Sequence, residues 1–261
     1  MNLSLWILAW WCFSAVYAEG ELTGVNIKDG YYDIFSQALA ADNTVISLFS
    51  TEKGTIELWV KLNSRPGKDG SAILFFGDRA YNNSITMFTE NKYRGLFARI
   101  SAADWGGQVS FDSPPLELNK WYHIALQWQT GGNKLEINKT KLFINGQAMP
   151  DSRRSAANNK SVTPGFLGGG LNDTAGHYFM LGGGNNNAGE LNRKLLPDME
   201  FSQLKISSEP LYDKDFTPSK NLAEDEKTLL LVNNDQGKLT ARHKKQPGNE
   251  VINVEIKLEK F

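Results

Sequence analysis

Short segments with alternating apolar and polar residues constrain the fold of this chain more than any other feature. Residues 54–62 read GTIELWVKL, with an apolar side chain at every second position from Ile56 to Leu62. Glycine-, asparagine- and proline-rich breaks separate the segments, which is typical of an all-β sandwich or barrel. Helical periodicity is limited to 35–42, where one or two turns are expected, and 216–225, where a loop with a short helix is expected. Similar strand candidates follow at 71–77, 84–90, 95–101, 108–112, 121–128, 134–137, 141–147, 177–183, 200–207 and 228–234.

The first eighteen residues have the pattern of a secretory signal peptide. They carry no charged side chain, they are apolar from Leu5 to Val16, and Val16 and Ala18 are the small residues before a cleavage site at Glu19. The apolar run is shorter than the roughly 20 residues of a membrane-spanning helix, so no membrane span is expected. The sequence therefore predicts a secreted or periplasmic protein.

Composition narrows the classes of partner and of chemistry. The 28 basic and 29 acidic residues leave a net charge of −1 and are well mixed along the chain, which argues against a nucleic-acid partner. The one cysteine, Cys12, lies inside the predicted signal peptide, so the mature chain is expected to have no disulfide, cysteine nucleophile or Cys-ligated metal.

Three strand segments together are similar to the laminin-G-like members of the concanavalin-A-like family. The matching residues are Trp59-Val60-Lys61 on an early strand, and Trp121, His123, Ala125, Leu142, Phe143, Ile144, Asn145 and Gly146 on a central hairpin. The resemblance runs from about residue 50 to 235. It implies a two-sheet antiparallel jelly-roll sandwich. Asn145-Gly146 also suits a tight hairpin turn on physical grounds, because both residues tolerate positive φ.

The resemblance also bears on calcium, which some relatives bind near acidic residues of a late strand. Here that strand carries Ser202 and Gln203 instead, which argues against a calcium site of the family type. Asp29 and Asp33 are an alternative source of carboxylate oxygens near the N-terminus. The sequence predicts no cofactor, and calcium at Asp29 and Asp33 stays open as an alternative.

His123 is the residue of the central strand that most resembles a catalytic group. It shares a strand face with Ala125 and Gln127, opposite Ile124 and Leu126. A general base needs a nucleophile or acid within reach, and the sequence has no Gly-x-Ser-x-Gly elbow to supply one. We expect His123 to be a structural residue of the sheet, and His177 and His243 to be surface residues.

Carboxylate pairs give little support to a glycoside hydrolase. Such enzymes need two carboxyl groups on either side of one bond, and several acids alternating on one strand are the usual arrangement. The nearest approximations are Asp198-x-Glu200, Asp213-x-Asp215 and the run at 224–226. The sequence therefore favours a non-enzyme.

Aromatic and amide residues in predicted turns are the candidate ligand-binding group. Sugar rings present C–H faces that stack on aromatic rings, and neighbouring amides can bind the hydroxyls. Trp105 directly precedes Gly106 and Gly107 at a predicted hairpin tip, where burial would be difficult. An alternative is that Trp105 packs on the sandwich and the asparagines only serve the turns. The candidates are Trp105, Tyr93, Asn185, Asn186 and Asn187.

The predicted organisation is a signal peptide at 1–18, a lead-in with a first strand at 19–49, a laminin-G-like jelly roll at 50–235, and a C-terminal strand or tail at 236–261. The function expected is a non-catalytic module that binds a glycan or an extracellular protein through loops of the sandwich. Two alternatives remain: a carbohydrate-active enzyme of the same fold, and a purely structural domain of a cell envelope or matrix. Fold alone does not choose among them.

Overall fold

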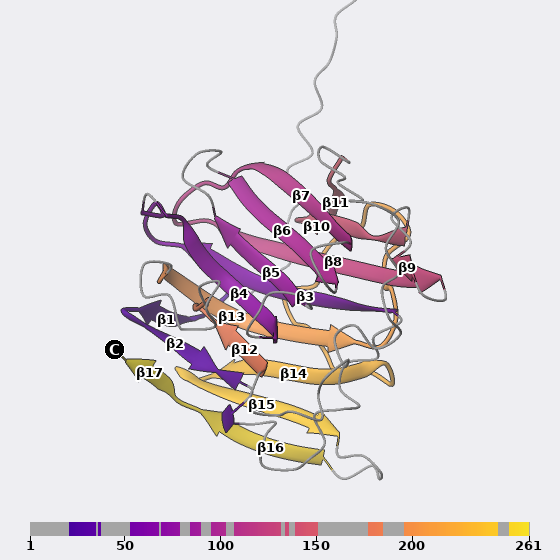
Figure 1. Cartoon of the computed structure of the whole chain (residues 1–261). Coiled ribbons are helices and arrows are strands. Elements are labelled where there is room, and N and C mark those ends of the chain that lie inside the picture. The colour runs from indigo at the N-terminus through magenta and orange to yellow at the C-terminus, as the bar shows by residue number, and fades with distance from the viewer. Residues whose placement is uncertain are drawn as a thin grey trace, which may run out of the picture.

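The computed structural model is a sandwich of two antiparallel β-sheets (Figure 1). This confirms the all-β, two-sheet antiparallel jelly-roll fold that the sequence predicts. No helix among the described residues is long and apolar enough to cross a membrane. The structure describes residues 21–34, 36–37, 53–67, 69–78, 84–89, 95–102, 107–131, 134–135, 139–150, 177–184, 196–244 and 251–260.

The larger sheet has ten strands. They are β1 (Val25–Lys28), β3 (Lys53–Leu62), β8 (Trp121–Gly131), β9 (Lys134–Leu135), β10 (Lys141–Ile144), β11 (Gln147–Ala148), β13 (Asp198–Ser207), β14 (Thr228–Asp235), β15 (Lys238–Lys244) and β16 (Val251–Ile256). Their order is β11-β10-β8-β3-β13-β14-β15-β16, with β1 also paired to β13 and β9 to β8.

The smaller sheet has seven strands. They are β2 (Gly30–Asp33), β4 (Ser71–Asp78), β5 (Ser84–Thr89), β6 (Gly95–Ala102), β7 (Gly107–Pro115), β12 (His177–Leu181) and β17 (Leu258–Lys260). Their order is β17-β2-β12-β4-β5-β6-β7. Consecutive neighbours β4 to β7 form an up-and-down meander, whereas β2, β12 and β17 join it from distant parts of the chain (Figure 1).

Apolar side chains from the facing sides of both sheets form one core. On β3 the predicted face is confirmed, since Ile56, Leu58 and Val60 are all buried in it. The corresponding residues of β8, Ile124 and Leu126, lie beside them in register. Burial of each such side chain contributes roughly 1.5–3 kcal/mol. Alternation along each strand therefore determines which side chains face the opposite sheet and which face outward.

A two-residue turn joins β10 to β11. Asn145 has a φ of 51° and Gly146 a φ of 77°, the left-handed region that such hairpin turns require. The Asn145 side chain also fixes the neighbouring strand, because its Oδ1 accepts a hydrogen bond of 2.9 Å from the His123 backbone N–H. The predicted hairpin turn at these two residues is confirmed.

The C-terminal strands close one side of the sandwich. β16 is the edge of the larger sheet, β17 is the edge of the smaller sheet, and only Lys257 lies between them (Figure 1). The Gln37 side-chain amide bonds both backbone groups of Lys257, accepting from its N–H at 2.7 Å and donating to its carbonyl at 2.9 Å. Gln37 thus substitutes for a neighbouring strand at the point where the chain changes sheets.

Candidate functional site

The outer face of the larger sheet is polar, yet it is buried. Thr55, Glu57 and His123 are each at most 2 % exposed, and Lys205 is 5 % exposed. The segment that covers them is residues 208–227, between β13 and β14, which we call the strap. The predicted short helix at 216–225 is wrong: the strap contains neither helix nor strand.

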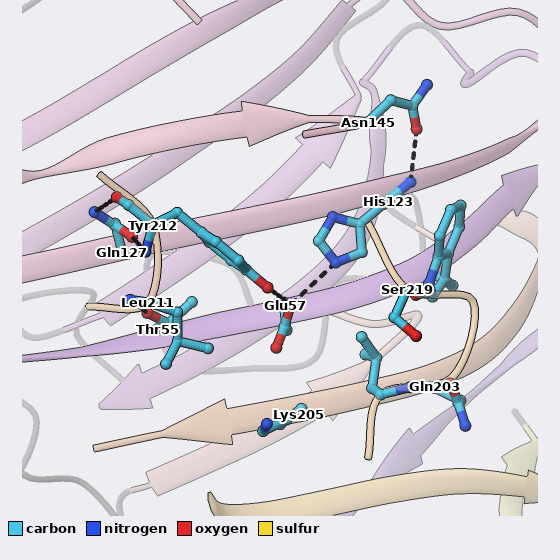
Figure 2. Close-up of polar contacts among 12 residues, drawn as sticks. Thr55, Glu57, His123, Gln127, Asn145, Gln203, Lys205, Leu211, Tyr212 and Ser219 are labelled. Carbon is cyan, nitrogen blue, oxygen red and sulfur yellow. Dashed lines mark hydrogen bonds and ion pairs between the residues drawn. The ribbon is translucent and has the colours of Figure 1, made fainter. Parts of the chain in front are cut away.

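Side chains of the sheet hold the strap in place by bonding its backbone. Gln127 makes a reciprocal pair with Tyr212, donating from Nε2 to the carbonyl at 2.8 Å and accepting from the N–H at 3.1 Å (Figure 2). The Trp59 indole N–H donates to the Ser219 carbonyl at 2.9 Å. These bonds satisfy buried backbone groups that a helix or ladder would otherwise satisfy, which explains why the strap is irregular.

Glu57, His123 and Tyr212 form a buried cluster beneath the strap. Glu57 Oε2 lies 3.1 Å from His123 Nε2 and accepts a hydrogen bond of 2.6 Å from the Tyr212 hydroxyl (Figure 2). His123 Nδ1 is buried and has no hydrogen-bond partner, which fits a proton on Nε2 that is donated to Glu57. The histidine ring also packs edge-on against Trp59 and Phe216. This geometry supports the structural role expected for His123.

An ion pair between the buried Lys205 and the exposed Asp225 lies beside this cluster. Lys205 is directly opposite Glu57 on the neighbouring strand, and its Nζ lies 2.7 Å from Asp225 Oδ2 of the strap. Burial tends to raise the pKa of Asp225, but hydrogen bonds from Lys205 and Thr228 and the charge of Lys205 hold it below its ordinary value. Asp225 is therefore a carboxylate that fastens the far end of the strap.

Tyr212 gives the strap a predictable response to alkali. Burial, the charge of Glu57, the hydrogen bond to Glu57 and the charge of Asp225 all raise the pKa of Tyr212 above its ordinary 10.0. A raised pKa in the folded state stabilises the fold below pH 10, and this stabilisation is lost progressively as pH rises further. We expect the free energy of unfolding in urea to fall less steeply from pH 9.5 to 11 in Tyr212→Phe than in the native chain.

Burial also raises the pKa of Tyr32. The free energy of unfolding should therefore still fall to some extent above pH 10 in Tyr212→Phe, as it does in the native protein. Equal slopes for the native chain and Tyr212→Phe would contradict the prediction.

The outer face of the smaller sheet differs, because part of it is exposed. One row across the strands reads Met180, Phe75, Thr86, Arg99 and Ser110, each directly opposite the next. Phe75 and Met180 are each 1 % exposed, so that part of the face is inaccessible. On this face, Asp33 of β2 is half-exposed, and so are four residues on β5 to β7. We call these four residues the outer-face quartet: Phe88, Phe97, Arg99 and Asp112.

The outer-face quartet combines aromatic, cationic and anionic groups on adjacent strands. The Phe88 and Phe97 rings lie 4.7 Å apart at 45°, and Asp112 is directly opposite Phe97. Next to them, Thr86 lies opposite Arg99, and its buried Oγ1 makes no hydrogen bond. Aromatic faces, a guanidinium, a carboxylate and a hydroxyl are the groups that bind the C–H faces and polar substituents of a sugar.

All five residues that the sequence singles out for ligand contact lie outside the described residues: Trp105, Tyr93, Asn185, Asn186 and Asn187. The described strands show only where the segments that contain these five residues leave the sheet. Residues 90–94 precede β6 and residues 103–106 follow it, so the two attachments are at opposite ends of a strand roughly 23 Å long. Residues 185–187 come shortly after β12, which ends at Leu181. Leu181 pairs with Leu74, and Leu74 pairs with Met87, near the end of β5 that leads to β6. Their roles in binding stay predictions.

The alternative calcium ligands are separated by a strand: Asp29 directly precedes β2 and Asp33 ends it, roughly 13 Å further along the chain. Asp29 is exposed, and Asp33 Oδ1 accepts a hydrogen bond of 3.1 Å from the Ser36 N–H. No group of three or more His, Cys, Asp or Glu side chains that could hold a metal occurs within the described ranges. A calcium site at Asp29 and Asp33 therefore has no geometric support.

The two histidines predicted to lie on the surface are His243, whose burial the structure describes, and His177, whose side chain it does not. The prediction for His243 is wrong, since it is 2 % exposed; it lies on β15, between β14 and β16 in the larger sheet. The side chain of His177 lies outside the described set.

Comparison with known proteins places the fold in a family. Residues 35–182 match the laminin-G-like model of the Concanavalin A-like lectin/glucanases superfamily. The chain belongs to this superfamily. The match covers the meander β4 to β7, which carries the outer-face quartet, and confirms the resemblance seen in the sequence.

Two solved structures resemble the chain at low sequence identity. The CBM40 of the Ruminococcus gnavus IT-sialidase, bound to α2,3-sialyllactose, is 21% identical with a TM-score of 0.51; the match covers 73% of this chain and 92% of that one. A leech intramolecular trans-sialidase in complex with 2,7-anhydro-Neu5Ac is 15% identical with a TM-score of 0.50, and the match covers 92% of this chain and 38% of that one. No curated protein matches the chain in sequence. These likenesses establish the fold.

Proposed function

We propose that this chain is a secreted or periplasmic, non-catalytic module that binds glycans. The observation that carries the proposal is the outer-face quartet. Phe88 and Phe97 offer a half-exposed aromatic surface on the adjacent strands β5 and β6, flanked by Arg99 and Asp112. Rigid strands hold these groups at fixed spacing, so a bound sugar would meet a surface that is already organised.

The structural neighbour bound to sialyllactose adds support from outside the chain. That CBM40 has a similar fold over 73% of this chain, and its structure was solved with α2,3-sialyllactose bound. Binding by this chain is our proposal, because one fold hosts many functions.

Export rests on the signal-peptide pattern of residues 1–18, and mass spectrometry of the purified protein should find a chain that begins at Glu19.

The polar cluster beneath the strap supports the non-catalytic part of the proposal. Its only acid, Glu57, is 2 % exposed and is already bonded to His123 and Tyr212. Tyr212 is not set up as a nucleophile, since burial and the charge of Glu57 raise its pKa. We propose that this cluster holds the strap and takes no part in a reaction.

A glycan array with the purified chain tests the proposed function. We expect binding that weakens about tenfold or more in Phe97→Ala, because an aromatic contact with the sugar is lost. Leu229→Ala is the matched control, a half-buried apolar residue on the larger sheet, and should bind as the native chain does. Thermal melts confirm that both variants fold.

Three other results would indicate a different binding site, activity or partner. Binding that ignores Phe97 but is lost in Trp105→Ala would place the site on the 103–106 segment. Release of a cleaved sugar from any bound glycan would support the enzyme alternative. An empty array would leave an extracellular protein partner or a structural role.

A further inference from the structure

We propose that Asn145 is a site of spontaneous deamidation, and that the isoaspartyl product of this reaction releases the strap from the hairpin turn. Asn145-Gly146 is the one Asn-Gly pair in the sequence. An asparagine followed by glycine is especially reactive in this chemistry, because glycine has no side chain to hinder attack by its backbone nitrogen. The inference is independent of the proposed glycan binding and concerns a chemical modification of the backbone.

The only reactants are Asn145, Gly146 and water. The Gly146 backbone nitrogen gives up its proton to hydroxide and attacks Cγ of Asn145. The Cγ–Nδ2 bond breaks, and ammonia leaves with a proton taken from water, which leaves a five-membered succinimide ring. Water then opens one of the two ring carbonyls: opening at Cγ gives aspartate, and opening at the main-chain carbonyl carbon gives isoaspartate, in which the chain runs through Cβ and Cγ. Either product carries one more negative charge than asparagine.

The fold requires both residue types of this reactive pair. Asn145 has a φ of 51° and pairs with His123 as a strand residue would: its N–H donates to the His123 carbonyl at 2.8 Å, and its Oδ1 accepts from the His123 N–H at 2.9 Å (Figure 2). Gly146 has a φ of 77°, and a Cβ added there would clash with the Phe216 carbonyl oxygen of the strap. The contact with the strap therefore excludes the bulkier residues that would slow the reaction.

The folded hairpin holds the reaction back. Ring closure brings Cγ into bonding distance of the Gly146 nitrogen, and the asparagine side chain must turn away from the His123 N–H to reach it. The strap also restrains the turn, because the Phe216 N–H donates to the Gly146 carbonyl at 2.9 Å and Asp215 Oδ1 accepts from the Ala148 N–H at 2.9 Å. Attack therefore requires a local opening of the turn, and the population of the open form sets the rate.

Isoaspartate does not fit this turn, whereas aspartate does. Isoaspartate adds one main-chain atom to a two-residue turn whose backbone angles have to match the flanking strands. The Gly146 carbonyl is then displaced from the Phe216 N–H, and the strap loses that bond. Aspartate keeps the oxygen that accepts from the His123 N–H, and Asp-Gly is also a favoured hairpin pair. Only the isoaspartyl product should therefore release the strap.

Peptide mapping of aged protein by mass spectrometry tests the modification. The purified chain and a synthetic peptide of residues 141–149 are incubated side by side at mildly alkaline pH, and conversion raises the mass by about 1 Da. We expect conversion at Asn145 in both, at least about tenfold more slowly in the folded chain. Equal rates would overturn the protection by the fold. A folded chain that stays unmodified after prolonged incubation would overturn Asn145 as a modification site.

A pair of strap variants tests whether the strap controls the reaction. Asp215→Ala removes the carboxylate that bonds the Ala148 N–H, and conversion should become about fivefold faster. The matched control is Asp213→Ala, another exposed aspartate of the strap. Asp213 bonds Lys141 through its backbone carbonyl, which alanine retains, so the rate should not change. Equal rates in the two variants would overturn control by the strap.

Hydrogen exchange of the products tests the release of the strap. Ion exchange enriches the deamidated chains, and enzymatic methylation of isoaspartate identifies the isoaspartyl fraction. The Phe216 N–H should exchange at least about tenfold faster in that fraction than in the native chain. Asn145→Asp carries the other product from the start and should exchange at the native rate. Native exchange at Phe216 in the isoaspartyl fraction would overturn the release.

Discussion

Replacing Gly146 by alanine should lower the free energy of unfolding by about 3 kcal/mol. Gly146 has a φ of 77°, which an L-residue adopts only at a cost, and an added Cβ would lie 1.9 Å from the Phe216 carbonyl oxygen of the strap. The same backbone oxygen cannot move freely, because the Phe216 N–H bonds the Gly146 carbonyl at 2.9 Å. Urea unfolding of the purified variant measures the loss.

Gly237→Ala is a close control for this prediction. Gly237 has a φ of 88°, similar to that of Gly146, but an added Cβ there meets nothing within 4 Å. It should therefore lose only the conformational part, about 1 kcal/mol. The difference between the two variants reports the contact between hairpin turn and strap. Equal losses in the free energy of unfolding for the two variants would mean that the strap backbone shifts at Phe216 at little cost, and would contradict the prediction.

Replacing Glu57 by alanine should cost about 3 kcal/mol, since it leaves two buried donors without an acceptor. His123 Nε2 and the Tyr212 hydroxyl both bond Glu57 Oε2, and neither has another partner in this cluster that could replace it. Backbone amide exchange should show where the fold loosens, with faster exchange at Tyr212 and Phe216 than in the native chain.

Two further variants bracket the effect. Glu57→Gln keeps one acceptor oxygen and should lose less than Glu57→Ala. Glu117→Ala removes an exposed carboxylate whose ion pair with Lys120 spans 3.0 Å, and should change the free energy of unfolding by no more than about 1 kcal/mol. A loss in Glu57→Ala no larger than in Glu117→Ala would contradict a structural role for the cluster.

The sequence predicts the strands and their faces well because both depend on local alternation. The period of two along 54–62 and 121–128 assigns Leu58 and Ile124 to the core and Glu57 and His123 to the opposite face, as the structure has them. The strap could not be found in this way. Its backbone partners are side chains such as Gln127 and Trp59, which are 85 and 160 residues away in the chain.

The candidate binding surface illustrates a second limit. Phe88 and Phe97 lie in segments predicted as strands, where alternation puts them on the same face as Thr86 and Arg99, but alternation does not say whether that face is covered. Exposure depends on the cover above the sheet, and this is a tertiary property. The aromatic residues that the sequence places in turns are Trp105 and Tyr93, and both lie outside the described residues.

The pairing of β2 with β17 has a consequence for folding during synthesis. The Tyr31 hydroxyl bonds Glu259 Oε2 at 2.7 Å across 228 residues of sequence. At about 5–20 residues per second, the ribosome needs on the order of 10–45 s between making the two partners. The early strand must wait for at least that interval with one hydrogen-bonding edge unpaired, and during this time the edge is open to pairing with another chain unless a chaperone covers it.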